Sequence, residues 1–278
     1  MESGRLARSG RASRAAAPRR RTRRPPTAAG TAALDDERGL PMIDLSADLA
    51  EGAPDEEQIW PMITSANVAC GGHVGDEHSM TEAVRRARRH NVRLGAHPSY
   101  PDRANFGRKS MAMALPALRT TLIQQINALR AIAEREGVLL QFVKPHGALY
   151  NDAHKDVVLA AGIVEAIREV DPSLAIVCAN TSEMATAARA SGTSVIREAF
   201  ADRRYNADGS LVSRSIAGSL LSVDEAAEQA TLLARERVVI ARDGSRVPVA
   251  FDTVCIHADM ENAVERLRAI RKRLGGSE

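Results

Sequence analysis

Four of the seven histidines follow short apolar segments that have the composition of buried β-strands. These histidines are His73, His97, His146 and His257. Charged side chains accompany them in DLSADLAEG (44–52), KPHGALYN (144–151) and CIHAD (255–259). Imidazoles and carboxylates that converge on one place can exchange protons with a substrate or bind a divalent metal ion. The residue types therefore predict a site for acid–base or metal-dependent chemistry.

Two chemical arrangements are open for this set. A catalytic metal needs about three protein ligands and an open position for water, which Asp48, His73 and His146 could provide. Without a metal, Asp48 or His73 would activate water, and Lys144 would stabilise a developing oxyanion. The arginines and asparagines of the same segments suit a small substrate that carries a carboxylate. We expect Asp48, His73, Lys144 and His146 to act in catalysis.

The elements that must position these residues alternate along the chain from Met42 onward. Seven segments have the near-continuous apolar composition of parallel strands that are covered on both faces. They span residues 42–46, 62–66, 92–96, 139–144, 174–179, 194–199 and 253–257. The amphipathic segments between them predict helices over residues 75–91, 115–137, 156–170, 182–192, 223–244 and 261–276. Asp76 suits the N-cap of the first helix, and Pro116 suits the first turn of the second.

A β–α alternation repeated seven times indicates a parallel sheet in one α/β domain. We expect the sheet to close into a seven-stranded (β/α) barrel resembling a TIM barrel, and an open doubly wound sheet is the alternative. In both folds the catalytic residues gather at the carboxyl ends of the strands. The polar residues that we expect at this edge are Asp44, Asp48, Glu51, Asn67, His73, His97, Arg103, Arg108, Lys144, His146, Tyr150, Glu198, Asp202, Arg203, Arg214, His257 and Asp259.

Some of these residues also have purely structural interpretations. Arg103 and Arg108 could pair with Asp102 and only hold a loop. Glu51 could be a solvated loop residue. Asp44 stands among apolar neighbours, and a buried carboxylate is costly unless it is paired or binds a ligand. This cost favours a role for Asp44 in the site.

The composition excludes several classes of protein. The 278 residues are 44% hydrophobic, and no apolar run reaches the ~18 residues of a membrane span. The three cysteines are widely spaced and form no CxxC pair, which disfavours a disulfide framework or a zinc ribbon and favours the cytoplasm. The motifs GxxxxGK[ST], GxGxxG and GxSxG do not occur in a suitable context. A Walker-type ATPase, a dinucleotide-binding protein and a serine hydrolase are therefore disfavoured.

The net charge of +3 is unevenly distributed along the chain. Residues 1–40 contain ten arginines against four acidic residues, so their net charge of +6 leaves about −3 for the remainder. This segment lacks apolar periodicity and cannot offset its chain entropy. We expect a disordered Arg-rich extension over residues 1–41, with no nucleic-acid or membrane partner, before a single catalytic domain over residues 42–278. Nucleic-acid binding, a transit peptide and a twin-arginine signal are the alternatives for the extension.

Six segments resemble, in order, the signatures of the LamB/YcsF family, which comprises the A subunits of 5-oxoprolinase. They are IDLSADLAEG, TSANVACGGHVGD, GAHPSYPDRANFGR, VKPHGALYN, EAFADRRYNADGSLVSRS and DTVCIHAD, which fall within residues 42–274. The resemblance implies a barrel related to the glycoside hydrolase/deacetylase superfamily. It also implies ATP-dependent opening of the lactam 5-oxoproline to L-glutamate, together with subunits B and C. The sequence has no phosphate-binding loop of its own, which agrees with an ATP-dependent step that requires subunits B and C.

Carried over residue by residue, the family's motifs fall on positions already singled out. Those expected to contact the substrate are Asp44, Asn67, His97, Arg103, Tyr150, Asp202, Arg203 and His257. A divalent metal stays open, with Asp48, His73 and His146 as candidate ligands. The alternative functions are a metal-dependent deacetylase or amidohydrolase that acts on another small amide or sugar, and a non-catalytic binding protein.

The chain departs from the family's usual pattern at four positions. Ser46 replaces Asn, Ala50 replaces Gly, Gly72 replaces Phe and Ala258 replaces Gly. Ser46 would remove an amide contact, and Gly72 would remove an aromatic wall. A divergent paralogue with another lactam or amide substrate is therefore also open.

Overall fold

The computed structural model describes residues 43–275 and Met1, and within this range seven parallel strands close into a barrel. The strands are β1 (Asp44–Leu49), β2 (Ser65–Ala69), β3 (Arg93–His97), β4 (Leu140–Val143), β5 (Ala175–Cys178), β6 (Val195–Phe200) and β9 (Thr253–His257). The first strand pairs with both β2 and β9, which closes the sheet. The predicted seven-stranded (β/α) barrel is confirmed. The predicted Arg-rich extension, residues 1–41, lies outside the described residues apart from Met1.

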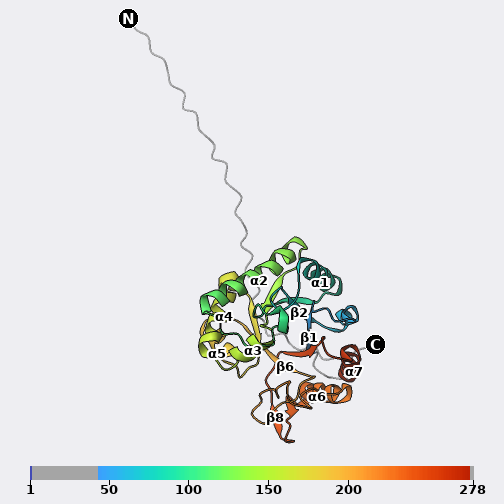
Figure 1. The fold of residues 1–278 in the computed structure, drawn as a ribbon. Coiled ribbons are helices and arrows are strands. Elements are labelled where there is room, and N and C mark those ends of the chain that lie inside the picture. Colours follow the sequence, from blue (N-terminus) through green and yellow to red (C-terminus); the bar gives the residue numbers. More distant parts are fainter. Residues whose placement is uncertain (2–42, 276–278) are drawn as a thin grey trace. The chain divides into compact units, whose positions relative to one another are not determined.

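Helices surround the barrel on its outside, as Figure 1 shows. They are α1 (Glu77–His90), α2 (Leu115–Arg135), α4 (Val157–Val170), α5 (Glu183–Ala190), α6 (Val223–Glu236) and α7 (Ala263–Leu274). Four short helical turns lie in the loops, namely η1 (Glu56–Gln58), η2 (Trp60–Met62), η3 (Arg103–Asn105) and α3 (Gly147–Ala153). None of the described helices has the length and apolar composition needed to cross a membrane.

Local sequence signals account for the helix starts. The Asp76 side chain accepts a hydrogen bond from the Ser79 backbone N–H, and the Ser79 hydroxyl accepts one from the Asp76 N–H. This capping box begins α1 where the sequence predicts it. Pro116 stands in the first turn of α2, where its missing N–H costs no helical hydrogen bond. The predicted apolar stripes of both helices are buried against the barrel.

The structure corrects the predicted bounds of several elements. Strands β1 and β2 each end three residues later than predicted, so Asp48 and Asn67 lie within them.

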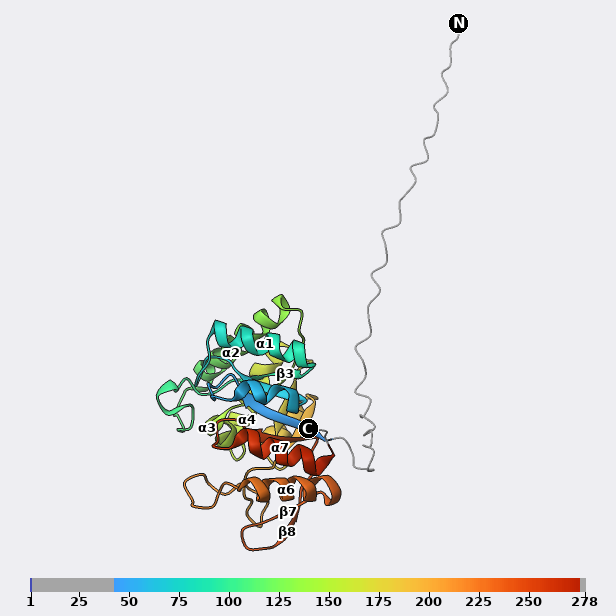
Figure 2. The same ribbon diagram turned by 90° about the vertical axis from the view of Figure 1, so that its right-hand side faces the viewer.

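Two further segments differ in type. The segment 223–244 is not one helix, because α6 ends at Glu236 and Arg237 adopts a left-handed conformation. An antiparallel hairpin follows, formed by β7 (Val238–Ile240) and β8 (Arg246–Pro248). The three β-branched residues of β7 favour a strand over a helix. Figure 2 shows this hairpin beside α6, at one side of the barrel. The segment after Lys144, predicted as a loop, contains the short helix α3.

The close approach of β3 and β4 requires a glycine. Gly95 pairs in register with Phe142, which is 1% exposed. A Cβ atom at Gly95 would lie 1.9 Å from Cε2 of the Phe142 ring. The ring is fixed by core packing, so it cannot move away without disturbing its neighbours.

We expect Gly95→Ala to lower the free energy of unfolding by about 1–3 kcal/mol through overpacking. The matched control is Gly162→Ala in α4, where the new Cβ would meet only the flexible end of Leu115, at 2.5 Å. Alanine also has the higher helix propensity there. Urea denaturation of both variants measures the difference. Equal stability of Gly95→Ala and the parent protein would contradict the packing described for β3 and β4.

Candidate active site

The buried ammonium group of Lys144 is the centre of a charge cluster at the carboxyl ends of the strands. Its Nζ donates hydrogen bonds to Asp48 Oδ1 and Oδ2, at 2.9 and 3.2 Å. It also lies 2.7 Å from Glu198 Oε1 and 3.2 Å from Cys255 Sγ. The side chains of Lys144, Asp48 and Glu198 are only 4%, 6% and 0% exposed. One cation therefore neutralises two carboxylates that have almost no contact with water.

These contacts determine the charge states of both partners. Burial alone would lower the pKa of Lys144, but the charges of Asp48 and its other neighbours hold this pKa well above its ordinary value. Burial alone would raise the pKa of Asp48, but His97 and Lys144 together hold it well below its ordinary value. Asp48 is therefore a carboxylate and Lys144 an ammonium ion at neutral pH. Asn67, its register partner on β2, adds a hydrogen bond to Asp48 Oδ1 at 2.9 Å.

Backbone carbonyl groups determine which nitrogens of two histidines carry protons. His97 Nδ1 lies 2.7 Å from the Lys144 carbonyl oxygen, and His146 Nε2 lies 2.9 Å from that of Phe106. A carbonyl oxygen only accepts, so both nitrogens must be protonated. The remaining nitrogens, His97 Nε2 and His146 Nδ1, face each other at 2.9 Å. One proton must lie between them for this contact to be favourable.

Electrostatics assigns that proton to His97. Burial alone would lower the pKa of His97, but the Asp48 carboxylate, 3.3 Å from Nε2, raises it above the ordinary value. Burial and the neighbouring His97 instead lower the pKa of His146. The pair is therefore an imidazolium at His97 that donates to a neutral imidazole at His146. This arrangement can deliver positive charge or a proton to a bound molecule.

Glu51 and His73 complete the cluster. Glu51 Oε1 lies 2.9 Å from His73 Nε2 and 3.4 Å from His146 Nδ1. Burial raises the pKa of Glu51 to about 7, and burial together with His97 lowers the pKa of His73 to about 3. The interpretation of Glu51 as a solvated loop residue is wrong, because its side chain is 2% exposed. A carboxyl group with this pKa can accept or donate a proton near neutral pH.

The loop after β3 covers these imidazoles. The rings of His73 and His146 are stacked, with centroids 3.7 Å apart, and Phe106 meets both edge-on. Gly107 has a φ of +64°, and a Cβ there would lie 2.9 Å from His73 Cβ, so only glycine fits. Arg103 holds the loop by donating to the carbonyl oxygens of Gly71 and Gly75, each at 3.1 Å. Its exposed side chain lies outside the charge cluster, and the pairing of Arg103 with Asp102 does not occur.

A second buried group lies where β6 and β9 end. Asp202 Oδ2 accepts a hydrogen bond from the His257 backbone N–H at 2.7 Å, and His257 Nδ1 lies 3.0 Å from both carboxylate oxygens. Burial alone would raise the pKa of Asp202, but His257 lowers it to about 2. His257 also pairs in register with Asp48, so this group borders the charge cluster. Tyr150, buried in α3, stands near Glu198, and burial with that carboxylate raises its pKa.

The structure does not bring Asp44 to this edge of the barrel. Asp44 is the first residue of β1, so its predicted place at the carboxyl end of the strand is wrong. Its carboxylate accepts from the Ser65 hydroxyl at 2.8 Å and pairs with Arg93 at 2.8 Å. These partners at the amino ends of the strands compensate the carboxylate, which removes the reason to expect a ligand there.

Two of the four departures from the family pattern, at Gly72 and Ala50, have local explanations. A Cβ at Gly72 would lie 2.3 Å from Gln125 Oε1, so the buried Gln125 occupies the space of a larger side chain. Ala50 has a φ of +61°, a conformation that glycine adopts without strain. The Glu56 carboxylate holds this turn by accepting from the Ala50 N–H at 3.0 Å. Ser46 lies two residues before Asp48 on β1 and therefore on the same face, one layer deeper in the barrel.

Three described residues could together hold a metal ion, but with a different carboxylate from the predicted one. Ligand atoms of Glu51, His73 and His146 all lie within 4.8 Å of one another, whereas Asp48 is occupied by Lys144. A tetrahedral zinc ion with bonds near 2.1 Å needs ligand atoms about 3.4 Å apart. The 3.4 Å between Glu51 Oε1 and His146 Nδ1 agrees with this spacing, whereas the 2.9 Å between Glu51 Oε1 and His73 Nε2 is a hydrogen-bond distance and is shorter. The parallel stacking of the two rings does not suit one ion either, because one ring must turn before both nitrogens can face it.

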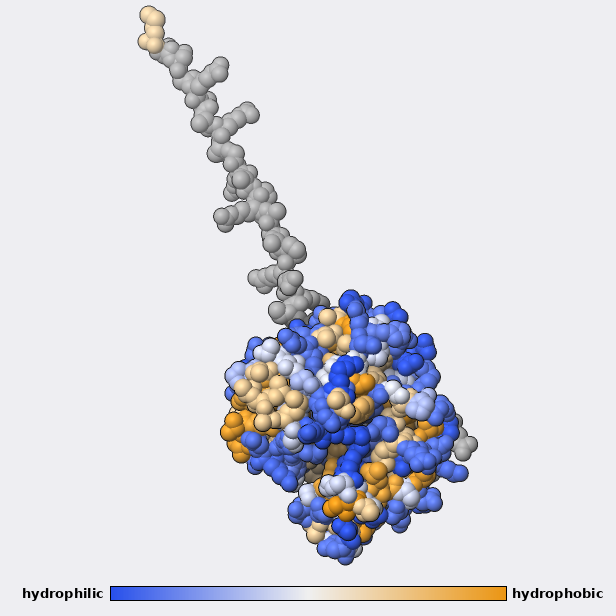
Figure 3. Space-filling view, viewed as in Figure 1, coloured by the Kyte–Doolittle hydropathy of each residue, from blue (hydrophilic) through white to orange (hydrophobic). Residues whose placement is uncertain are grey.

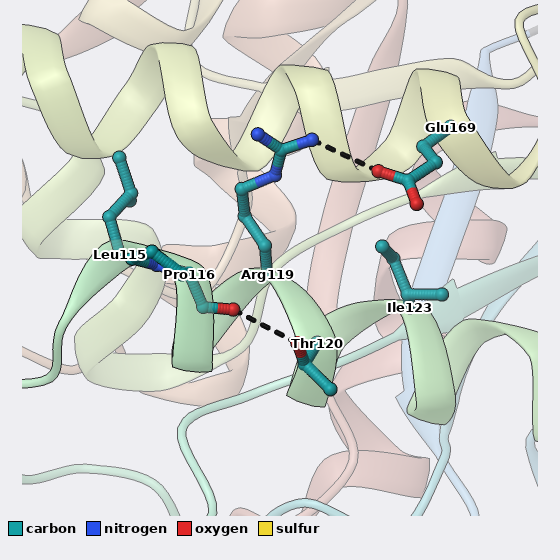
Figure 4. A pocket seen from close by; sticks show the side chains of 6 residues that line it. All are labelled: Leu115, Pro116, Arg119, Thr120, Ile123 and Glu169. Carbon is teal, nitrogen blue, oxygen red and sulfur yellow. Dashed lines mark hydrogen bonds and ion pairs between the residues drawn. The ribbon is translucent and has the colours of Figure 1, made fainter.

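A surface pocket of about 290 Å³ lies between α2 and α4, on the outer helical layer (Figure 4). Arg119, which lines it, pairs with Glu165 and Glu169 at 2.9 Å each. The Thr120 hydroxyl donates to the Pro116 carbonyl oxygen. These polar groups satisfy one another, so the pocket offers little to a reacting ligand.

On the face of the molecule drawn in Figure 3, hydrophilic residues lie across the centre, between hydrophobic patches.

Comparison with known proteins places this geometry in a wider context. The LamB/YcsF family matches residues 43–278. A protein named as the A subunit of 5-oxoprolinase, from Histophilus somni (strain 129Pt), is 43% identical over 236 residues, which cover 84% of this chain and 96% of that protein. The crystal structure of a lactam utilization protein from Thermus thermophilus is similar with a TM-score of 0.78 and 40% identity. That match covers 84% of this chain and 95% of the other.

We expect Lys144→Met to lower the free energy of unfolding by about 3–5 kcal/mol, because it leaves two buried carboxylates without a cation. Adding Glu198→Gln to this variant removes one of the two charges and should restore part of the loss. Urea denaturation of the parent, single and double variants measures both effects. A loss below about 1 kcal/mol, the range of surface ion pairs, would contradict the central role of the ammonium group.

Glu51 is expected to reduce stability when it ionises in metal-free protein. Its folded pKa of about 7 exceeds the ordinary 4.5, so stability falls as pH rises through this window. After treatment with a chelator, Glu51→Gln should therefore melt at a higher temperature than the parent at pH 8 and at the same temperature near pH 4.5. Calorimetry at both pH values measures this. A Glu51→Gln variant that is less stable at pH 8, in a protein that retains a chelator-resistant ion, would indicate a metal ligand instead.

Proposed function

The chain belongs to the LamB/YcsF family, and from this membership we propose that it opens the lactam ring of 5-oxoproline to form L-glutamate. The proposal includes ATP as a co-substrate and partner subunits B and C. The names of two relatives, one the A subunit of 5-oxoprolinase and the other a lactam utilization protein, support it. The observation that carries it is the buried series of contacts from Lys144 through Asp48 and His97 to His146.

The residues of this series have complementary roles in opening an amide. Water attacks the lactam carbonyl carbon, and the Lys144 ammonium stabilises the negative charge that develops on the oxygen. The Glu51 carboxylate accepts the proton from water. The His97 imidazolium supplies a proton, through His146, to the ring nitrogen as the C–N bond breaks. Asp48 keeps both cations charged and in place.

ATP enters the proposal through the chemistry of the substrate and through the partners. A five-membered lactam is a stable amide, so coupling its opening to ATP hydrolysis makes the reaction favourable. The sequence contains no phosphate loop, and we therefore assign the nucleotide step to the assembly with subunits B and C. Three free, buried cysteines suit a reducing compartment, and we propose a cytoplasmic location.

A second candidate function is metal-dependent hydrolysis of another small amide or of an acetylated sugar. Glu51, His73 and His146 favour it because they would hold the ion, which would activate water. The departure at Ser46, on the same face of β1 as Asp48, allows a substrate other than 5-oxoproline. The stacked orientation of the two imidazoles favours the metal-free reaction instead.

In the assembly with subunits B and C, His146→Ala and Asp48→Ala should each lower glutamate release by at least about 100-fold, as expected for loss of acid–base groups. Glutamate formed from 5-oxoproline and ATP is the measured quantity. The matched control is His78→Ala, since His78 is exposed on α1 and should leave the rate unchanged. Parent-like turnover in both site variants would refute the proposed role of the cluster.

A further inference from the structure

Three arginines meet at the β6–β9 side of the candidate site and have no part in the chemistry proposed above. Arg108, from the loop after β3, forms an ion pair with Asp259, which follows β9. Arg214 Nη1 lies 3.7 Å from the same carboxylate. Arg203 follows β6, and the charges of Arg214 and Arg108 both act on it. Two guanidinium groups therefore share the carboxylate of Asp259, and the third, Arg203, forms no ion pair or hydrogen bond with it.

Arg203 is the unusual member of this group. It is only 7% exposed, yet among residues 43–275 only its Nη2 atom donates a hydrogen bond, to the Val212 carbonyl oxygen at 2.7 Å. Its buried Nε atom has no hydrogen-bond partner within the same range. The neighbouring carboxylate of Asp202 is bonded to His257 instead. A buried guanidinium group that lacks a carboxylate partner is costly, which indicates that a ligand completes it.

The position of Arg203 relates it to the charge cluster. Asp202, the preceding residue, is bonded to His257, and His257 pairs in register with Asp48. The guanidinium carbon of Arg108 lies 5.0 Å from the centroid of the Phe106 ring, which meets His73 edge-on, so Arg108 lies beside the imidazoles of the charge cluster. The strand β6, which Arg203 follows, is two strands from both β1 and β4, so about 10 Å of sheet separates its end from theirs. A small amino-acid derivative held by the long arginine side chain can bridge this distance.

We propose that Arg203, flanked by Arg108 and Arg214, binds the carboxylate of the lactam substrate and selects cyclic amides that carry this negative charge. The inference rests on the proposed lactam-opening function and names its specificity residue. The planar guanidinium fork matches the two oxygens of a carboxylate. With the carboxylate held at β6, the amide of the same ring is directed toward Lys144 and His146.

Binding of a charged and a neutral lactam to the full chain tests this assignment. Isothermal titration calorimetry compares 5-oxoproline with 2-pyrrolidinone, which lacks the carboxylate. The parent protein should bind 5-oxoproline at least about tenfold more tightly, and Arg203→Gln should weaken that binding by about 10- to 100-fold, as for loss of a charged hydrogen bond. The variant's affinity for 2-pyrrolidinone should stay within about threefold of the parent's. Arg203→Lys should retain part of the preference for 5-oxoproline over 2-pyrrolidinone, because the positive charge is kept.

The matched control is Arg266→Gln. Arg266, on α7, is equally buried and its Nε also has no partner within residues 43–275, but two of its other nitrogens donate to the carbonyl oxygens of Glu261 and Leu221. Its loss should leave the preference for 5-oxoproline intact. Equal binding of both lactams by the parent, or equal weakening of both by Arg203→Gln, overturns the assignment. Displacement of 5-oxoproline by a lower concentration of inorganic phosphate also overturns it in favour of a nucleotide phosphate.

The outcomes separate this inference from the proposed function. Glutamate release without discrimination between the two lactams would remove the role of Arg203 and leave the lactam-opening activity standing. If the protein binds 5-oxoproline more tightly than 2-pyrrolidinone but the assembly releases no glutamate, the carboxylate subsite is retained and the proposed reaction is refuted. The binding measurement does not depend on turnover, so each result can be obtained by itself.

Discussion

The contact of one buried ammonium group with two carboxylates is the interaction on which the candidate site depends. Lys144 comes from the end of β4, whereas Asp48 and Glu198 come from β1 and β6, so the contact joins three separate parts of the barrel. Each ion would be unfavourable alone in this dry environment, and each becomes tolerable only with the others present. The ionised Asp48 then raises the pKa of His97, which creates a second cation beside the first. The electrostatics of the whole cluster follows from this one group.

Main-chain atoms contribute as much to this chemistry as side chains do. The carbonyl oxygens of Lys144 and Phe106 accept hydrogen bonds from His97 Nδ1 and His146 Nε2. The shared proton of the two histidines can therefore lie only between the other two nitrogens, His97 Nε2 and His146 Nδ1. Both carbonyl groups belong to segments that leave the carboxyl ends of strands. A parallel barrel places several such segments around one opening, which explains how residues 48, 97 and 146 act together.

The sequence predicted the barrel and most of the charge cluster because both depend on short-range patterns. Apolar runs alternate with amphipathic segments, and Asp48, His97, Lys144 and His146 follow from the rule that polar residues at strand ends share one edge. The buried state of Glu51 could not be predicted in this way, because it depends on contacts with His73 and His146, which are distant in sequence. Other differences arise from competition between local and tertiary effects. The helical pattern of α6 continues past Glu236, but the β-branched residues 238–240 form a hairpin instead. The exclusion of a large side chain at Gly72 depends on Gln125, more than fifty residues away, and no pattern around position 72 contains that information.

The Phe106 carbonyl oxygen that fixes the His146 proton belongs to the same loop that lies over the imidazoles. Any displacement of this loop by an incoming molecule removes the acceptor from His146 Nε2, and the imidazole can then exchange one tautomer for the other. A molecule that displaced the loop on entering would therefore also free the histidine proton. In the structure as described, the Phe106 carbonyl group holds His146 in a single tautomer.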